Sequence, residues 1–151
     1  MPPTPVYIAG AGLTKFGKLD TPLVDLLAQA ADSALEQAGL DTVDSVYVGV
    51  MNAEEFTGEG NLAVTLADHL GLSGAASSRV ETASSTGAGA LETAFFAVAS
   101  GYRKHVLVVA GEKMTGLSTG RTTSILAEVI ANRERAYGAS MPSLAALVAG
   151  A

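Results

Sequence analysis

The 151-residue sequence contains no cysteine. This absence excludes a disulfide framework, a cysteine-ligated metal and a cysteine nucleophile within the chain. Basic residues are also few, with nine Lys and Arg against fifteen Asp and Glu, and they form no run. The net charge of −6 argues against a nucleic-acid partner or an anionic-membrane partner.

Long hydrophobic runs are missing as well. No stretch approaches the roughly 20 apolar residues that span a bilayer. Residues 1–10 (MPPTPVYIAG) lack the basic start and the long apolar core of a signal peptide. We therefore expect a cytoplasmic protein with no membrane contact.

Metal and nucleotide motifs are sparse too. The two histidines, His69 and His105, stand far apart in the sequence without neighbouring ligands, so we expect both to be structural or exposed and expect no metal site. The pair Gly10 and Gly12 lacks the third glycine of a dinucleotide fingerprint, because position 15 is a lysine. We expect these glycines to allow tight packing, and we expect no bound cofactor.

What is present is an alternation of apolar strands and helices, in a chain that is 48% hydrophobic and 16% charged. Such alternation predicts an α/β fold with a mostly parallel sheet flanked by helices on both faces. The polar run 52–60 is expected to be a loop. Strands are predicted at 6–12, 43–51, 78–84 and 106–110, the last buried on both faces. Helices are predicted at 22–38 (capped by Asp20 or Thr21), 61–70, 86–100 (with Leu91, Phe95 and Val98 inward), 125–135 and 143–149.

The stretch 79–91 (RVETASSTGAGAL) organises the rest of the chain. It reads as a strand that turns sharply into a helix, and ligands collect at such carboxyl ends of parallel strands. A side chain at this turn faces the positive end of a helix dipole, a position where several folds keep a nucleophile. Ser84 is best placed for that role.

The alternative for Ser84 is a helix cap, because Ser and Thr side chains at positions 84–86 suit a helix N-terminus. A serine nucleophile also needs an adjacent base, and a helix dipole contributes at most about 2 kcal/mol, too little to ionise an alcohol. Three acids, Glu81, Glu92 and Glu112, remain as candidates, and the sequence does not show them converging.

These residues resemble the thiolase family. Residues 80–87 (VETASSTG) are similar to the thiolase nucleophile segment V-E-x-A-C-x-S-G, with Ser84 at the cysteine position. Residues 106–115 (VLVVAGEKMT) look like the family's fourth strand and EKM signature. The runs 54–61 (EEFTGEGN) and 137–142 (YGASMP) look like the sterol-carrier-protein-x branch and its archaeal and bacterial relatives.

The resemblance implies a three-layer thiolase-type N-terminal half, incomplete in this chain. Residues 1–115 would form its core, and 116–151 the start of the loop region that covers coenzyme A. It also implies contacts to coenzyme A, as part of the substrate, from Arg121, Thr122, Thr123 and Ser124, although Arg121 could equally be a solvated charge. The fifth strand and the C-terminal half, with the GHP histidine, would come from elsewhere, and the faces that meet them should be apolar.

The implied function is one part of a split acyl-CoA acyltransferase that makes or breaks a C–C bond next to a CoA thioester, inactive alone. Ser84 leaves two alternatives open: a thiolase-fold aldolase that releases a ketone from a β-hydroxyacyl-CoA, and a non-catalytic subunit for CoA binding or assembly. A truncated chain is a third explanation. The resemblance also implies a homodimer through strand 78–84 and a zinc-ribbon/OB-fold partner protein.

Overall fold

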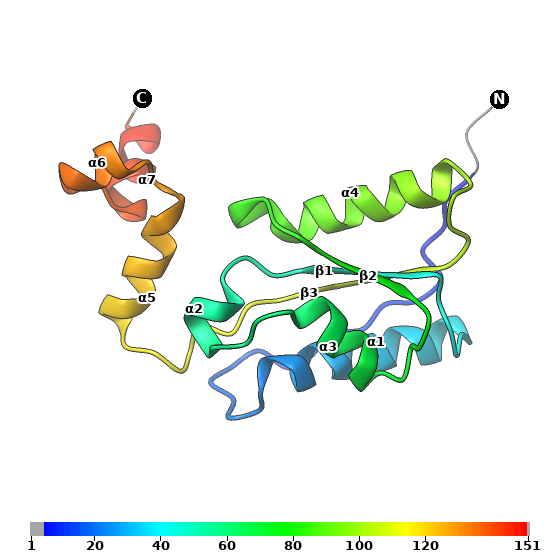
Figure 1. The fold of residues 1–151 in the computed structure, drawn as a ribbon. Helices are drawn as coiled ribbons and strands as arrows, with labels where there is room; N and C mark the ends of the chain where they lie inside the picture. Colours follow the sequence, from blue (N-terminus) through cyan, green and yellow to red (C-terminus); the bar gives the residue numbers. More distant parts are fainter. Residues whose placement is uncertain (1–4, 151) are drawn as a thin grey trace.

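The computed structural model describes residues 5–150 and is built on a three-stranded parallel sheet (Figure 1). The strands are β1 (Ser45–Gly49), β2 (Ala76–Val80) and β3 (Val106–Ala110), in the order β2-β1-β3. Ser45 at the start of β1 aligns with Ala76 and with Val106, so the three strands begin and end together. Their carboxyl ends therefore form one edge, as the α/β alternation predicted.

Helices cover both faces of this sheet and make three layers. Helices α1 (Leu23–Ala38) and α3 (Leu62–His69) pack on one face, and α4 (Thr86–Ala99) packs on the other (Figure 1). Helix α1 ends at Gly39, whose φ of 65° is the left-handed conformation that glycine adopts without strain. No helix within residues 5–150 has the length and hydrophobicity needed to cross a membrane.

The main hydrophobic core lies between the sheet and the α1–α3 layer. Alternate strand residues point into it, because successive side chains of a strand face opposite sides. Its buried members larger than alanine are Leu23, Leu27, Val46, Val48, Val50, Leu62, Leu66, Leu72, Leu107 and Val109. The expectation that β3 is buried on both faces is wrong: Val106 and Val108 are only half-buried and Ala110 is exposed.

Helix α4 approaches the sheet through small residues. Its buried residues are Thr86, Ala90 and Ala94, and a Cβ added at Gly49 would lie 3.2 Å from the Cβ of Ala90. The prediction that Leu91 and Phe95 point inward is therefore wrong, whereas Val98 is half-buried. Leu91 is 54% exposed and Phe95 49% exposed, because the close approach to the sheet selects the alanine stripe of the helix and turns the larger residues outward.

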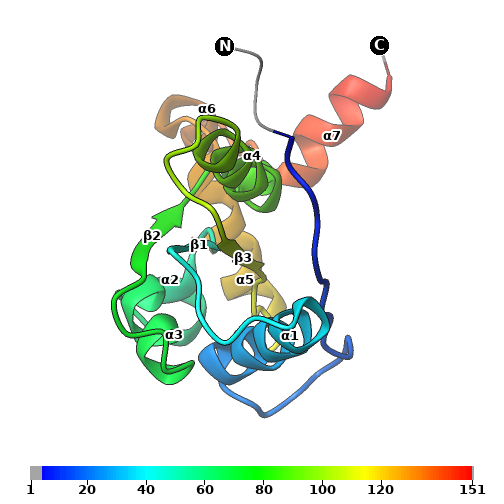
Figure 2. The same ribbon diagram turned by 90° about the vertical axis from the view of Figure 1, so that its right-hand side faces the viewer.

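The N-terminal segment is not the predicted strand at 6–12. Residues 5–22 contain no helix or strand; the described segment descends to α1 and packs against it (Figure 2). A Cβ at Gly10 would lie 2.2 Å from the carbonyl oxygen of Ala34, and one at Gly12 would lie 1.9 Å from that of Ala30. The glycines thus allow tight packing as expected, but against a helix, and in the described residues the segment has no ladder partner to make it a strand.

Several boundaries also differ from the prediction. The loop at 52–60 contains helix α2 (Ala53–Thr57), and the strand at 78–84 is shifted to 76–80. Helix α1 begins after Pro22 without a side-chain cap from Asp20 or Thr21. The helix predicted at 125–135 is replaced by α5 (Thr119–Leu126), the 3₁₀ turn η2 (Ala127–Val129) and α6 (Asn132–Ala136), because Ile130 adopts an extended backbone.

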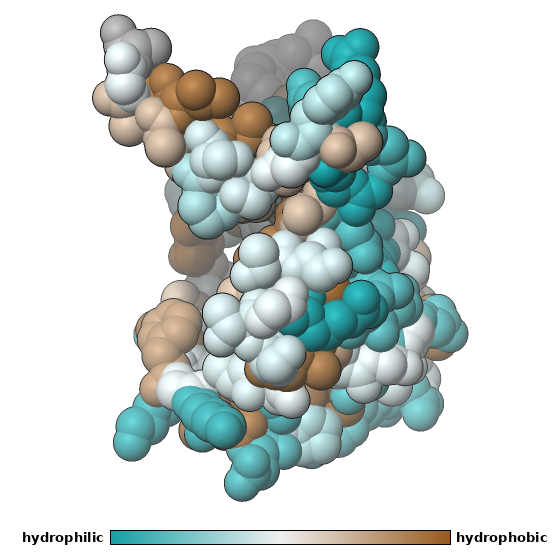
Figure 3. Space-filling view, turned by 90° about the vertical axis from the view of Figure 1, so that its left-hand side faces the viewer, coloured by the Kyte–Doolittle hydropathy of each residue, from teal (hydrophilic) through white to brown (hydrophobic). Residues whose placement is uncertain are grey.

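Helix α7 (Met141–Ala149) confirms the helix predicted at 143–149 and starts with a capping box between Ser140 and Ser143. Together α5, α6 and α7 project from the three-layer core (Figure 1). Leu147 and Val148 on α7 are 71% and 80% exposed. Figure 3 shows this side of the molecule, with hydrophobic surface on the projecting C-terminal end.

Candidate functional site

Ser84 lies on a tight, strained turn between β2 and α4. Ala83 has a φ of 52°, a left-handed conformation that costs an alanine roughly 1–2 kcal/mol. Ala83 begins the 3₁₀ turn η1 (Ala83–Ser85), which runs directly into α4. Strain of this kind persists only where the surroundings hold it, and it occurs often at functional sites.

The neighbouring hydroxyls hold this turn, and Ser84 does not. Ser85 Oγ donates to the carbonyl of Thr82 at 2.8 Å, and Thr86 Oγ1 donates to the carbonyl of Ala83 at 2.6 Å. Thr86 Oγ1 also accepts the N–H of Thr82 at 3.0 Å. Ser84 is exposed, and its hydroxyl makes no hydrogen bond to any described residue. The helix-cap alternative is therefore wrong for Ser84, whose hydroxyl is left for solvent or a ligand.

Small residues bring this turn over the carboxyl edge of the sheet. A Cβ at Gly49, the last residue of β1, would lie 3.2 Å from the carbonyl oxygen of Thr86 and 3.2 Å from the Cβ of Ala110. The first turn of α4 therefore rests on the ends of β1 and β3. Ser84 stands at the helix N-terminus beside that edge, as the sequence predicted.

The three candidate acids do not converge on Ser84 in a shared hydrogen-bond network. Glu81 accepts the N–H of Ala83 and so belongs to the turn itself. Glu92 is exposed on the outer face of α4. Glu112 lies just after β3, where its Oε2 accepts the N–H of Met51 at 2.9 Å and that of Asn52 at 3.4 Å.

Glu112 is the most unusual titratable group of this edge. Burial raises its pKa above the ordinary value of 4.5, and the two N–H donors offset that rise only in part. Its second oxygen, Oε1, is buried and has no hydrogen-bond partner among the described residues. The carboxylate thus holds the turn through Oε2, while the unpaired Oε1 costs free energy.

Arg79 holds the same turn from the opposite strand, and the sequence prediction missed it. Its Nε donates to the carbonyl of Val50 at 2.8 Å, and its Nη2 donates to the carbonyl of Met51. Its Nη1 pairs with Glu54 at 2.5 Å, an interaction that lowers the pKa of Glu54. The available sequence signal was a lone arginine inside a strand of small residues.

The predicted CoA-contact residues 121–124 lie on α5. Arg121 forms an ion pair with Glu55 of α2, and Thr122 Oγ1 donates to the carbonyl of Met114 at 3.5 Å. The solvated-charge alternative for Arg121 is too simple, since its guanidinium is paired although half-exposed. Contact of these four residues with coenzyme A stays a prediction.

The two histidines contact residues outside the Ser84 turn. His69 Nε2 is 3.6 Å from the carboxylate of Asp25 on α1. His105 precedes β3 at the amino edge, where its backbone N–H donates to Asp44 at 2.9 Å; this bond and the N–H of Lys104 lower the pKa of Asp44. Within residues 5–150, no group of three or more His, Asp or Glu side chains is placed to hold a metal ion.

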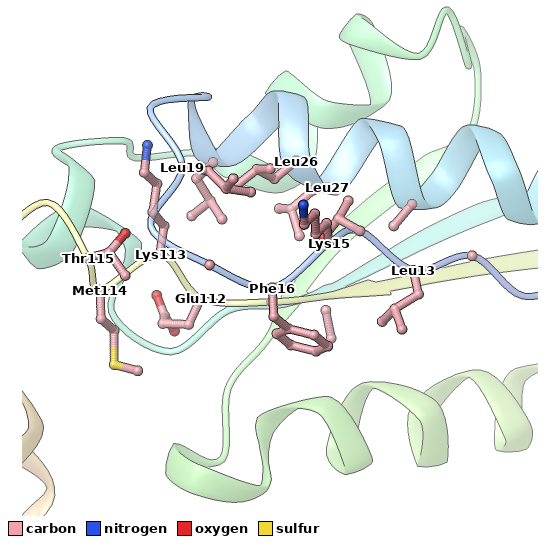
Figure 4. A pocket seen from close by; sticks show the side chains of 17 residues that line it. Leu13, Lys15, Phe16, Leu19, Leu26, Leu27, Glu112, Lys113, Met114 and Thr115 are labelled. Carbon is pink, nitrogen blue, oxygen red and sulfur yellow. The ribbon is translucent and has the colours of Figure 1, made fainter.

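A hollow of about 210 Å³ lies between the N-terminal segment, α1 and the tail of β3 (Figure 4). Leu13 and Phe16 line it from the N-terminal segment, and Leu27 lines it from α1. Glu112 and Lys113 line it from the tail of β3, and Lys113 Nζ donates to the carbonyl of Thr21 at 2.5 Å. The tail of β3 thus lines this hollow and also contacts the carboxyl edge of the sheet, beside which Ser84 lies.

The chain places a strand-to-helix turn with an exposed hydroxyl at the carboxyl edge of a parallel sheet. Its sequence also matches a known family. Residues 6–150 match the family described as "Thiolase, N-terminal domain". The chain belongs to the thiolase N-terminal domain family. The three-layer arrangement of this thiolase domain therefore agrees with the resemblance at residues 80–87 and 106–115.

Two acetyl-CoA acetyltransferases are similar to this thiolase domain over 147 residues. The enzyme of Methanocaldococcus jannaschii is 40% identical, over 95% of this chain and 37% of its own length. The enzyme of Methanothermobacter thermautotrophicus is 37% identical, over 95% of this chain and 38% of its own length. The chain therefore spans little more than a third of the relatives it matches.

Solved structures share the fold. The 3-oxoacyl-(acyl carrier protein) synthase III, FabH, of Pseudomonas aeruginosa PAO1 has a TM-score of 0.53 and 28% identity, over 62% of this chain and 29% of that one. The priming β-ketosynthase of the R1128 polyketide biosynthetic pathway has a TM-score of 0.55 and 36% identity, over 64% of this chain and 28% of that one. The three-layer arrangement is thus a thiolase-type N-terminal half.

Proposed function

We propose that this chain is the N-terminal half of a thiolase-like acyl-CoA acyltransferase. The assembled enzyme would form or cleave a C–C bond next to a CoA thioester. The exposed, unbonded Ser84 hydroxyl on the strained turn at the start of α4 carries the proposal. The family match and the two acetyl-CoA acetyltransferase relatives support it.

Ser84 limits which chemistry the turn performs. In thiolysis, a nucleophile attacks the β-carbonyl carbon and the bond to the α-carbon breaks. The departing acyl-CoA enolate takes up a proton, and the acyl group passes from the nucleophile to the sulfur of a second CoA, whose thiol gives up its proton. A thiol near pKa 8.5 is activated by a helix N-terminus, whereas an alcohol also needs a base to take its proton. Neither histidine of this chain contacts the Ser84 hydroxyl in the described residues. A serine-based reaction would therefore need a base from another polypeptide.

The surface supports completion by a second polypeptide. Leu91, Phe95 and Phe96 expose 49–59% of their surface on the outer side of α4. Tyr7 and Ile8 on the N-terminal segment are both 83% exposed. Contiguous apolar surface of this kind marks an interaction site. We propose that a C-terminal thiolase half, with the fifth strand and the GHP histidine that the resemblance implies, covers these faces.

Further partners are proposed from the resemblance. Residues 121–124 on α5 would contact coenzyme A. A homodimer would form through the exposed edge of β2, which pairs on one side only within the described chain. Membership of the sterol-carrier-protein-x branch would add a zinc-ribbon/OB-fold partner, and we expect the assembly to work in the cytoplasm.

A thiolase-fold aldolase is the second candidate, and Ser84 favours it. Release of a ketone from a β-hydroxyacyl-CoA needs no acyl-enzyme, so the cysteine position is free to change. A non-catalytic subunit that binds CoA or supports assembly is the third candidate. The absence of a thiol from the whole chain is the observation that supports the aldolase and the non-catalytic subunit as alternatives.

The test is to co-express the chain with the neighbouring reading frame and to compare two reactions: acetoacetyl-CoA thiolysis and retro-aldol cleavage of a β-hydroxyacyl-CoA. Ser84→Cys and Ser84→Ala enter the same assays. We expect thiolysis in the Ser84→Cys assembly, because a thiolate at a helix N-terminus is stabilised. Retro-aldol activity that survives Ser84→Ala would establish the aldolase. No activity in any assembly would refute an enzymatic role.

A further inference from the structure

The turn after β1, residues 50–52, is held by two charged side chains that use different atoms of the same backbone. Arg79 from β2 donates to the carbonyls of Val50 and Met51, with the first contact at 2.8 Å. Glu112 from the tail of β3 accepts the N–H groups of Met51 and Asn52, at 2.9 and 3.4 Å. Donors and acceptors of one short turn are thus both satisfied by charged partners, which make stronger hydrogen bonds than neutral ones.

The same turn begins helix α2, and α2 carries the contacts to the projecting helices. Asn52 Nδ2 donates to Glu128 Oε2 of η2 at 3.3 Å. Glu55 on α2 pairs with Arg121 on α5. Ala53 and Phe56, on the inner side of α2, are 0% and 5% exposed, so α2 is anchored in the core while its polar side faces α5.

We propose that Glu112 is a positioning residue that sets the placement of α5 through this turn. It holds Met51 and Asn52 directly, the turn orients α2, and α2 holds α5 and η2 through the Glu55–Arg121 and Asn52–Glu128 contacts. Arg79 secures the turn from the other side. The inference rests on the proposed function in one respect: residues 121–124 of α5 are the segment expected to contact coenzyme A.

The unpaired oxygen of Glu112 indicates that this carboxylate is present to position the turn and not to stabilise the core. Its Oε2 serves the turn, while Oε1 is buried with no partner among residues 5–150. A carboxylate kept in that condition is destabilising in itself, since a buried unsatisfied charge costs free energy. A side chain suited to stability alone would be apolar here. The two N–H groups that the carboxylate holds explain its presence.

The test compares Glu112→Leu with Glu112→Gln by hydrogen exchange of the whole chain. Leucine keeps the volume and removes the acceptor, whereas glutamine keeps an oxygen that can accept both N–H groups. We expect Glu112→Leu to raise exchange about tenfold or more at residues 51–52 and across 118–130, with residues 45–49 changing by about twofold or less. Glu112→Gln should restore protection to within about threefold of wild type.

A matched control removes the same charge elsewhere. Glu36→Leu, at an exposed position of α1, should leave exchange across 118–130 unchanged. The proposal is overturned if Glu112→Leu exposes residues 51–52 while 118–130 keeps its protection. It is equally overturned if Glu36→Leu loosens 118–130 as much as Glu112→Leu does.

A second variant decides the matter where Glu112→Leu does not fold. The pair Asn52→Ala and Glu55→Ala removes the outer contacts and leaves Glu112 in place. It should loosen 118–130 while the amide of Met51 stays protected, and unchanged exchange across 118–130 would overturn the proposal. In the assembled enzyme, Glu112→Leu should raise KM for the acyl-CoA about fivefold or more with kcat changed less than about twofold. A wild-type assembly without activity would count against the proposed function, while the exchange result still decides the positioning role.

Discussion

Gly49→Ala tests whether small residues set the position of the Ser84 turn. Gly49 ends β1 directly beneath the first turn of α4. The added methyl would lie 3.2 Å from three heavy atoms: the Cβ of Ala110, the Cβ of Ala90 and the carbonyl oxygen of Thr86. Each of these atoms belongs to or sits directly on regular backbone, so none can rotate away. The methyl must therefore push α4 from the sheet.

The expected cost follows from the packing. Carbon atoms pack best at roughly 3.5–4.0 Å, so contacts at 3.2 Å require α4 to shift by a few tenths of an ångström. Insertion of a methyl group into a tightly packed site destabilises by about 1–3 kcal/mol. Alanine restricts the unfolded chain and recovers about 0.4–1 kcal/mol of that. We expect a net loss of about 1–2 kcal/mol in the free energy of unfolding.

Urea unfolding followed by circular dichroism measures this loss. Gly120→Ala is the matched control, because Gly120 lies in α5 and a Cβ added there would meet nothing within 4 Å. It should stabilise α5 by up to about 1 kcal/mol through helix propensity. A double-mutant cycle with Ala90→Gly, which removes one of the opposing methyls, should show a coupling of about 0.5–1 kcal/mol in the direction of relief.

Two results would refute the reasoning. Gly49→Ala as stable as wild type would mean that α4 does not rest on the end of β1. Zero coupling with Ala90→Gly would mean that the loss does not arise from the contact with Ala90. Gly49→Ala should also raise amide exchange at residues 83–86, because the displaced carbonyl belongs to that turn.

Three further predictions follow from the charged and exposed side chains. Arg79→Met should destabilise the chain by about 2–4 kcal/mol, because two backbone carbonyls and Glu54 lose a charged donor, and carboxyl titration by NMR should show the pKa of Glu54 returning toward 4.5. Burial raises the pKa of Glu112, so the contribution of this side chain to stability is greatest below pH 4.5 and is lost as the pH rises through the raised value. In urea unfolding, the stability of Glu112→Gln relative to wild type should therefore be higher at pH 7 than at pH 4. Phe96 is 59% exposed, so Phe96→Ser should change the free energy of unfolding by less than about 0.5 kcal/mol and should reduce binding of a hydrophobic dye. A larger loss in the free energy of unfolding would instead place Phe96 in the core.

Local sequence patterns predicted the regular elements that depend on near neighbours. Helix α1 ends at Gly39 as its apolar spacing and glycine stop indicated, and β3 occupies Val106–Ala110 as predicted. Helix α7 starts at a capping box next to Pro142. These features arise within a few residues of chain, where hydrogen bonds and backbone restrictions act directly.

Features that depend on distant partners were predicted less well. The apolar run 6–12 has the composition of a strand, yet a strand exists only with a ladder partner, and the described segment packs on α1 instead. In α4 the hydrophobic spacing pointed to Leu91 and Phe95, while the close approach through Gly49 buried Ala90 and Ala94. Side-chain size on the sheet decided which face of that helix lies inward.

The sequence by itself determined the family, the strand-to-helix turn and the candidate Ser84, because residues 80–87 carry the motif and the turn in one continuous stretch. Only the tertiary structure decided that Ser85 and Thr86 hold the turn while the Ser84 hydroxyl stays unbonded. It also decided that Arg79 and Glu112, 33 positions apart in the numbering, meet at the turn after β1. Parallel strands bring their carboxyl ends to one edge, and that convergence joins residues that no local pattern connects.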